Sequence, residues 1–85
     1  MSWNLRVARR AQKELNRVPV KDQSRILAAL REMSENPFSG DIAPLKGQLT
    51  GWRRRVGNYR IFFDVHPDIT LIEVTDIARR SSTTY

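Results

Sequence analysis

The chain has 85 residues and a formal net charge of +6 at pH 7, with 40% hydrophobic and 28% charged residues. These values predict one folded domain over residues 1–85 and exclude an intrinsically disordered chain. The absence of cysteine excludes a disulfide scaffold and thiolate metal sites. Arginine supplies 12 of the 15 basic residues, which favours a polyanionic partner such as nucleic acid.

Residues 3–20 predict a short strand followed by a first helix. Apolar and polar residues alternate from Trp3 to Val7, which is typical of a strand. From Ala8 to Val18 the apolar residues recur at helical spacing, and Pro19 ends this helix.

A second helix is predicted from about Val20 to Asn36, where Pro37 follows and stops it. Two successive amphipathic helices separated by a proline form an antiparallel hairpin whose apolar faces need a sheet to cover. The apolar stripe of the second helix is expected to consist of Val20, Ile26, Leu27, Leu30 and Met33.

The stretch 51–65 predicts two strands joined by the turn Gly57-Asn58. A Gly-X pair between alternating aromatic and β-branched residues is typical of a type II′ hairpin. This turn fixes the strand register. The predicted pairs are Val56–Tyr59, Arg55–Arg60, Arg54–Ile61, Arg53–Phe62 and Trp52–Phe63.

The predicted register gives the hairpin two different faces, because side chains alternate along a strand. One face is apolar except for Arg54. The other, polar face carries Arg53, Arg55, Arg60, Phe62 and Asp64. On the polar face Arg55 lies opposite Arg60, which is unfavourable by roughly 0.2–1 kcal/mol, and a fold normally breaks such a rule at a functional site. We interpret the polar face as a polyanion site; the alternative is a solvated face whose arginine stems cover apolar surface.

The remaining segments complete an α+β domain with the order β-α-α-β-β-β. Residues 37–51 are predicted to form a loop, 65–69 a turn, 70–77 the last strand, and 78–85 a polar tail. The last three strands form a small antiparallel meander, which the first strand joins. The helical hairpin packs on one face, and the arginine-bearing face stays open.

Most enzyme templates are absent from the sequence. There is no glycine-rich phosphate loop, no Ser-His-Asp spacing and no sequence pattern of metal ligands, so we expect neither a metal nor another cofactor. His66, the single histidine, lies in a predicted turn and is interpreted as structural.

Three motifs resemble the RelE/ParE superfamily of bacterial and archaeal toxins, and the RelE branch in particular. They are Leu45-Lys46-Gly47, the stretch 51–65 that reads GWRRRVGNYRIFFDV, and the C-terminal IARR followed by a terminal tyrosine. The resemblance covers essentially the whole chain and implies the RelE-like fold.

The resemblance implies a toxin of a type II toxin–antitoxin system that cuts mRNA on the ribosome. The implied chemistry is attack of a ribose 2′-OH on the adjacent phosphate, which yields a 2′,3′-cyclic phosphate and a 5′-OH. This reaction needs stabilisation of phosphorane charge, an acceptor for the 2′-OH proton and a donor for the 5′-oxygen.

The resemblance also implies roles for individual residues. Arg53 and Arg55 match basic positions that are often lysine, and Arg60 matches a phosphate-binding arginine. Arg79 matches an arginine assigned to protonating the leaving group, and Tyr85 a tyrosine that stacks on or orients the nucleotide. Additional RNA contacts are expected from Lys46, Arg54 and Arg80.

The arginines at the lysine positions leave the general base open. An effective base has a pKa near the working pH, and arginine does not lose its proton in proteins. We therefore expect Arg53 and Arg55 to bind charge, with the base supplied by Tyr85, a water molecule or the ribosome.

Three other functions fit the same sequence: a ParE-like inhibitor of DNA gyrase without nuclease activity, a non-catalytic RNA-binding module, and an inactive toxin that still binds its antitoxin. The expected partners are a cognate antitoxin, mRNA and the ribosome, in the cytoplasm and without a membrane. We expect the antitoxin to cover the arginine face or to displace the C-terminal tail.

Overall fold

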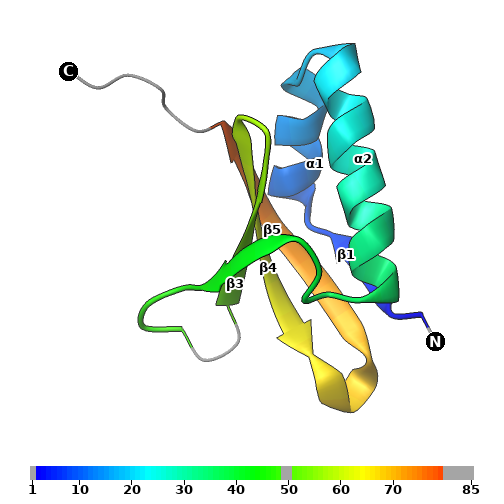
Figure 1. The fold of residues 1–85 in the computed structure, drawn as a ribbon, viewed down its shortest axis with the longest axis vertical. Helices are drawn as coiled ribbons and strands as arrows, with labels where there is room; N and C mark the ends of the chain where they lie inside the picture. Colours follow the sequence, from blue (N-terminus) through cyan, green and yellow to red (C-terminus); the bar gives the residue numbers. More distant parts are fainter. Residues whose placement is uncertain (1, 49–50, 80–85) are drawn as a thin grey trace.

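The strand and two helices predicted for the first part of the chain are present in the computed structural model, which describes residues 2–48 and 51–79 (Figure 1). The α+β class is confirmed. The order of elements is β1 (Asn4–Val7), α1 (Arg9–Arg17), α2 (Val20–Glu35), β2 (Asp41–Pro44), β3 (Gly51–Val56), β4 (Tyr59–His66), a 3-10 turn (Pro67–Ile69) and β5 (Leu71–Arg79).

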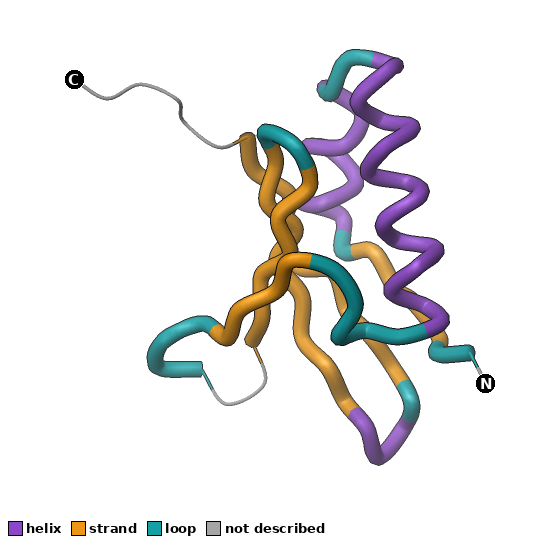
Figure 2. The backbone as a smooth tube through the Cα atoms, viewed as in Figure 1, coloured by secondary structure: helices purple, strands orange, loops and turns teal. Residues whose placement is uncertain are grey.

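The two helices form one layer on a single side of the sheet, as Figure 2 shows. In α1 the apolar positions Ala11 and Leu15 are buried, and α2 buries Ile26, Leu30 and Met33. Val20 and Leu27, which were expected in the same stripe, are instead 78% and 42% exposed.

The sheet has the strand order β1-β5-β4-β3-β2, with β4 at its centre. The predicted meander is confirmed, because β3–β4 and β4–β5 pair in antiparallel fashion. The first strand joins the sheet by pairing with β5 in parallel. The helix-covered face carries the core of β4 and β5, which consists of Tyr59, Ile61, Phe63, Val65, Ile72, Val74 and Ile77.

Three segments differ from the prediction. The turn predicted over 65–69 is confined to Pro67–Ile69, so Val65 and His66 belong to β4. The segment predicted as a loop contains β2, a four-residue strand paired with β3 at the edge of the sheet. It was missed because Pro44 interrupts so short a strand pattern, although proline is tolerated on an edge strand. The last strand extends to Arg79, two residues beyond the predicted end.

No helix within residues 2–48 and 51–79 could cross a membrane. Neither α1 nor α2 combines the length and the apolar character that a membrane-spanning helix requires.

Candidate nucleic-acid interface

The β3–β4 hairpin has the predicted turn and the predicted register. Gly57 has φ +56°, whereas Asn58 is not among the residues with positive φ, a combination that fits a type II′ turn. All five predicted cross-strand pairs are present, including Arg55 opposite Arg60. Each β4 residue therefore faces the side of the sheet that its sequence position predicts.

Three of the predicted site residues share the face of the sheet that the helices leave uncovered. We call Arg53, Arg55 and Arg60 the arginine face. Arg55 is exposed, whereas Arg53 and Arg60 are half-buried. A carboxylate oxygen of Asp41 on β2 lies 3.8 Å from Nη1 of Arg53, but the Asp41 side chain is 60% exposed. Asp41 therefore offsets little of the positive charge.

Two nitrogen atoms of the arginine face are buried without a hydrogen-bond acceptor among the described residues. They are Nη1 of Arg53 and Nε of Arg60. An unsatisfied buried donor is costly, and its presence in a folded protein requires an explanation. Nη1 of Arg53 has the Asp41 carboxylate at 3.8 Å, beyond hydrogen-bond distance, and Nε of Arg54 on the opposite face is unsatisfied in the same way. An anion site is therefore indicated by the gathering of three guanidiniums on one open face.

Phe62 lies among the arginines and was not predicted as a site residue. It is paired with Arg53, and the guanidinium carbon of Arg60 lies 5.9 Å from the centre of its ring. Beside it is a hollow of about 340 Å³ lined by Leu45, Gln48, Phe62, Thr75 and Asp76. The sequence could have identified Phe62, because the alternation of the strand places this aromatic ring on an otherwise charged face.

Arg79 does not lie on the arginine face. It pairs with Tyr59, so its side chain emerges on the side of the sheet that the helices cover. There it lines a cavity of about 180 Å³ together with Tyr59, Arg17 and Glu14. The role that the resemblance implies for Arg79 requires it to lie beside the other arginines. The structure does not bring it there, because Arg79 ends β5 and follows the alternation of that strand.

The Tyr59 hydroxyl donates a hydrogen bond to Oδ2 of Asp22 on α2, at 3.2 Å. Burial raises the pKa of Tyr59 above its ordinary value of 10, and the neighbouring Asp22 carboxylate raises it further, while Arg79 acts in the opposite direction. The neutral Tyr59 side chain thus links α2 to the start of β4 through this hydrogen bond.

The variant Tyr59→Phe is expected to be less stable at neutral pH, because it lacks the bond to Asp22. A pKa that is higher in the folded state gives stability that is complete below pH 10 and is lost as the pH rises through the folded-state value. The difference from wild type should therefore shrink above pH 10. Urea unfolding of both proteins across this range measures it, and a pH-independent difference would contradict the assignment.

Arg54 faces the helices and is only 7% exposed. Its Nη1 donates to the carbonyl oxygen of Ala29, at 3.3 Å, and to Oγ of Ser39, at 3.2 Å. Its Nη2 pairs with the carboxylate of Glu32. These contacts hold Arg54 on the side of the sheet away from the arginine face, so we withdraw it from the expected RNA contacts and assign it a structural role.

Gly40 packs against the Arg54 guanidinium, so a substitution at Gly40 tests how rigidly that group is held. Gly40 and Gly47 both have φ +78°, but a Cβ at Gly40 would lie 2.8 Å from Cζ of Arg54, whereas a Cβ at Gly47 would meet nothing within 4 Å. Alanine at either site incurs roughly 1–2 kcal/mol of backbone strain. We expect Gly40→Ala to have a lower melting temperature than Gly47→Ala. Equal decreases in the two variants would show that the Arg54 side chain moves aside without cost.

The other predicted site residues fall outside the cluster. Lys46 is exposed in the turn that follows β2. Arg80 and Tyr85 lie outside the residues that the structure describes, so their expected roles stay predictions.

Comparison with known proteins places the chain in a family. The family model for the ParE toxin of the type II toxin–antitoxin system parDE matches residues 5–83. A search of curated proteins gave no match.

Solved structures with the same fold come from bacteria and archaea. The RelE–RelB complex of Pyrococcus horikoshii OT3 superposes with a TM-score of 0.84 at 20% identity, over 98% of this chain and 100% of that chain. The isolated E. coli RelE toxin gives 0.82 at 17% identity, over 96% and 88%. The RelB–RelE complex of Methanococcus jannaschii gives 0.73 at 28% identity, over 87% and 88%.

The family model and these structures agree on the superfamily, although their names come from different branches of it. The match to the family model spans most of the chain, and the shared fold extends over nearly all of it. The chain therefore belongs to the RelE/ParE superfamily of toxins of type II toxin–antitoxin systems.

Proposed function

We propose that this toxin is a ribosome-dependent endoribonuclease that cuts mRNA by attack of a 2′-OH on the scissile phosphate. The observation that carries the proposal is the arginine face. It places three guanidiniums on the open side of the sheet. A phosphorane gains negative charge as it forms, so these cations would stabilise it most at the transition state.

In this proposal Arg60 is the central phosphate ligand. It lies on the central strand, opposite Arg55, and its half-buried guanidinium is set against Phe62. Arg53 and Arg55 add charge from β3. The ring of Phe62 offers a surface on which a base next to the scissile phosphate can stack, beside a hollow whose other lining residues are mostly polar.

Proton transfer requires groups other than these arginines. A guanidinium keeps its proton, so the base is Tyr85, a water molecule or a ribosomal group. The proton for the departing 5′-oxygen comes from the protonated base, a water molecule or a ribosomal group. An arginine can only stabilise the negative charge on that oxygen, and we assign this role to Arg80, because Arg79 lies on the helix side. The pair Arg79→Gln and Arg80→Gln tests this choice, with the greater loss of cleavage expected for Arg80→Gln.

The proposed protein partner is an antitoxin. Two of the similar structures are RelE toxins in complex with RelB. The net charge of +6 and the uncovered arginine face suit an acidic segment that would block the RNA site.

The decisive experiment maps the 5′ ends of mRNA after incubation with the purified toxin, with ribosomes and without them. Cleavage at discrete positions only when ribosomes are present is the expected result. The same toxin must arrest growth when it is expressed in cells. If such a toxin leaves mRNA intact in both reactions, the proposed nuclease activity is wrong.

Inhibition of DNA gyrase is the second candidate function, and the match to the ParE family model favours it. A gyrase supercoiling assay with the same preparation separates the two. The ParE-like reading predicts loss of supercoiling with intact mRNA, whereas the RelE-like reading predicts the reverse.

A further inference from the structure

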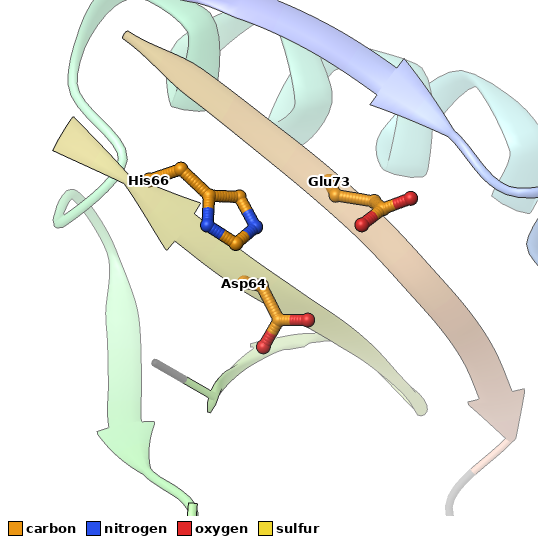
Figure 3. A group of neighbouring side chains, drawn as sticks. All are labelled: Asp64, His66 and Glu73. Atoms are coloured by element: carbon orange, nitrogen blue, oxygen red, sulfur yellow. The ribbon is translucent and has the colours of Figure 1, made fainter. Parts of the chain in front are cut away.

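A second cluster of charged side chains lies at the other end of the uncovered face. Asp64 and His66 come from the end of β4, and Glu73 comes from β5 (Figure 3). All three are half-buried, and each offers a ligand atom within 4.8 Å of those of the other two. The cluster shares no residue with the arginine face, whose nearest member, Arg53, pairs with Phe62, two residues before Asp64 on β4.

The cluster breaks a rule of sheet pairing. Asp64 and Glu73 are direct cross-strand partners, and two like charges in this position repel each other. Arg6 on β1 pairs with Glu73, but its Nε lies 3.9 Å from the carboxylate and its side chain is 72% exposed. So weak an ion pair offsets little of the negative charge of Glu73.

The backbone already brings these three donors together. Asp64 and His66 are two residues apart on one strand, so their side chains share a face, and Glu73 reaches the same face from the adjacent strand. Ligand atoms around a tetrahedral ion with bonds of about 2.0–2.2 Å lie about 3.4 Å apart. Binding of such an ion therefore requires the three side chains to turn toward one another from strands that are already paired.

We propose that Asp64, His66 and Glu73 form a binding site for a divalent transition-metal ion of the Zn²⁺ type. One imidazole nitrogen and two carboxylate oxygens are a donor set that such ions accept, and three protein ligands leave a coordination position for water. A bound ion neutralises the two carboxylates and links β4 to β5. The site is independent of the proposed nuclease activity, because it shares no residue with the arginine face.

The sequence did not reveal this site, because its third member comes from a different strand. Asp64 and His66 are close in sequence, but Glu73 joins them only through the β4–β5 register. That register includes an irregularity between Phe62 and Phe63, which sets the pairing of everything beyond it.

Titration of the untagged full-length chain with ZnCl₂ tests the proposal by calorimetry and by NMR. The chain has one histidine and no cysteine, so the imidazole signal reports on this site alone. We expect saturable binding of one Zn²⁺ per chain together with a shift of the His66 ring signals. Absence of saturable binding, or binding without a shift of those signals, would overturn the site.

Variants of the ligands and of a neighbour complete the test. His66→Gln and Glu73→Gln should each weaken Zn²⁺ binding by more than about tenfold, since even the outer-shell partners of metal ligands contribute that much. Arg6→Gln, which changes a charge next to the site but removes no ligand, should bind Zn²⁺ at least as tightly as wild type. Unchanged affinity in both ligand variants, with a native circular dichroism spectrum, would contradict the assignment.

Discussion

Replacing Arg60 by glutamine is expected to lower ribosome-dependent mRNA cleavage by about 10²–10³-fold, the typical effect of removing one donor that stabilises developing charge. Arg60 lies on the central strand beside Phe62, and its Nε has no acceptor in the described part of the chain. The loss should appear in the rate of the chemical step. Single-turnover cleavage of mRNA on toxin-saturated ribosomes measures that step separately from binding.

Arg79→Gln is the matched control for Arg60→Gln. Both substitutions remove one guanidinium at the same end of the sheet, because Arg60 pairs with Ala78 and Arg79 with Tyr59. Arg79 lies on the helix side, so we expect its loss to reduce cleavage much less. Equal losses in the two variants would show that position on the arginine face does not decide function.

The hairpin was predictable because its signals are local. The glycine turn fixes the register, the register fixes the faces, and the alternation then places Arg53, Arg55 and Arg60 together. The alternation also places Arg54 on the apolar face. Its partners Glu32 and Ser39 could not be predicted, because those contacts depend on how α2 and the following segment cross β3.

The errors in the predicted site have the same physical origin. Assigning Arg79 to a tail removed the constraint of alternation. In the structure β5 continues for two residues beyond Ile77, and the pairing of Arg79 with Tyr59 places its side chain on the helix-covered side. The edge strand β2 was missed because its four residues carry too little periodicity. Its pairing with β3 brings Asp41 opposite Arg55 and near Arg53, a placement that depends on tertiary structure.

Arg54→Ala is expected to lower the free energy of unfolding by about 2–4 kcal/mol, the largest loss of stability predicted for this chain. The substitution removes a nearly fully buried side chain together with its hydrogen bonds to the Ala29 carbonyl and to Oγ of Ser39. Large-to-small substitutions in cores cost about 2–5 kcal/mol, and each hydrogen bond lost costs about 0.5–1.5 kcal/mol. Urea unfolding followed by circular dichroism measures the change through the midpoint.

Two further variants separate the charge of Arg54 from its packing. Arg54→Met keeps most of the stem and removes the guanidinium, and replacing a buried ionic group by an apolar one is often nearly neutral. Glu32→Gln removes the charge of the partner, whose side chain is 63% exposed, so we expect a loss below about 1 kcal/mol. A stable Arg54→Met beside an unstable Arg54→Ala would show that Arg54 acts mainly by filling space between α2 and the sheet.

The outcome that contradicts the structural role is a free energy of unfolding of Arg54→Ala within about 0.5 kcal/mol of the wild-type value, the range for ordinary surface substitutions. In that case Arg54 has no structural role and its assignment to RNA contact must be restored.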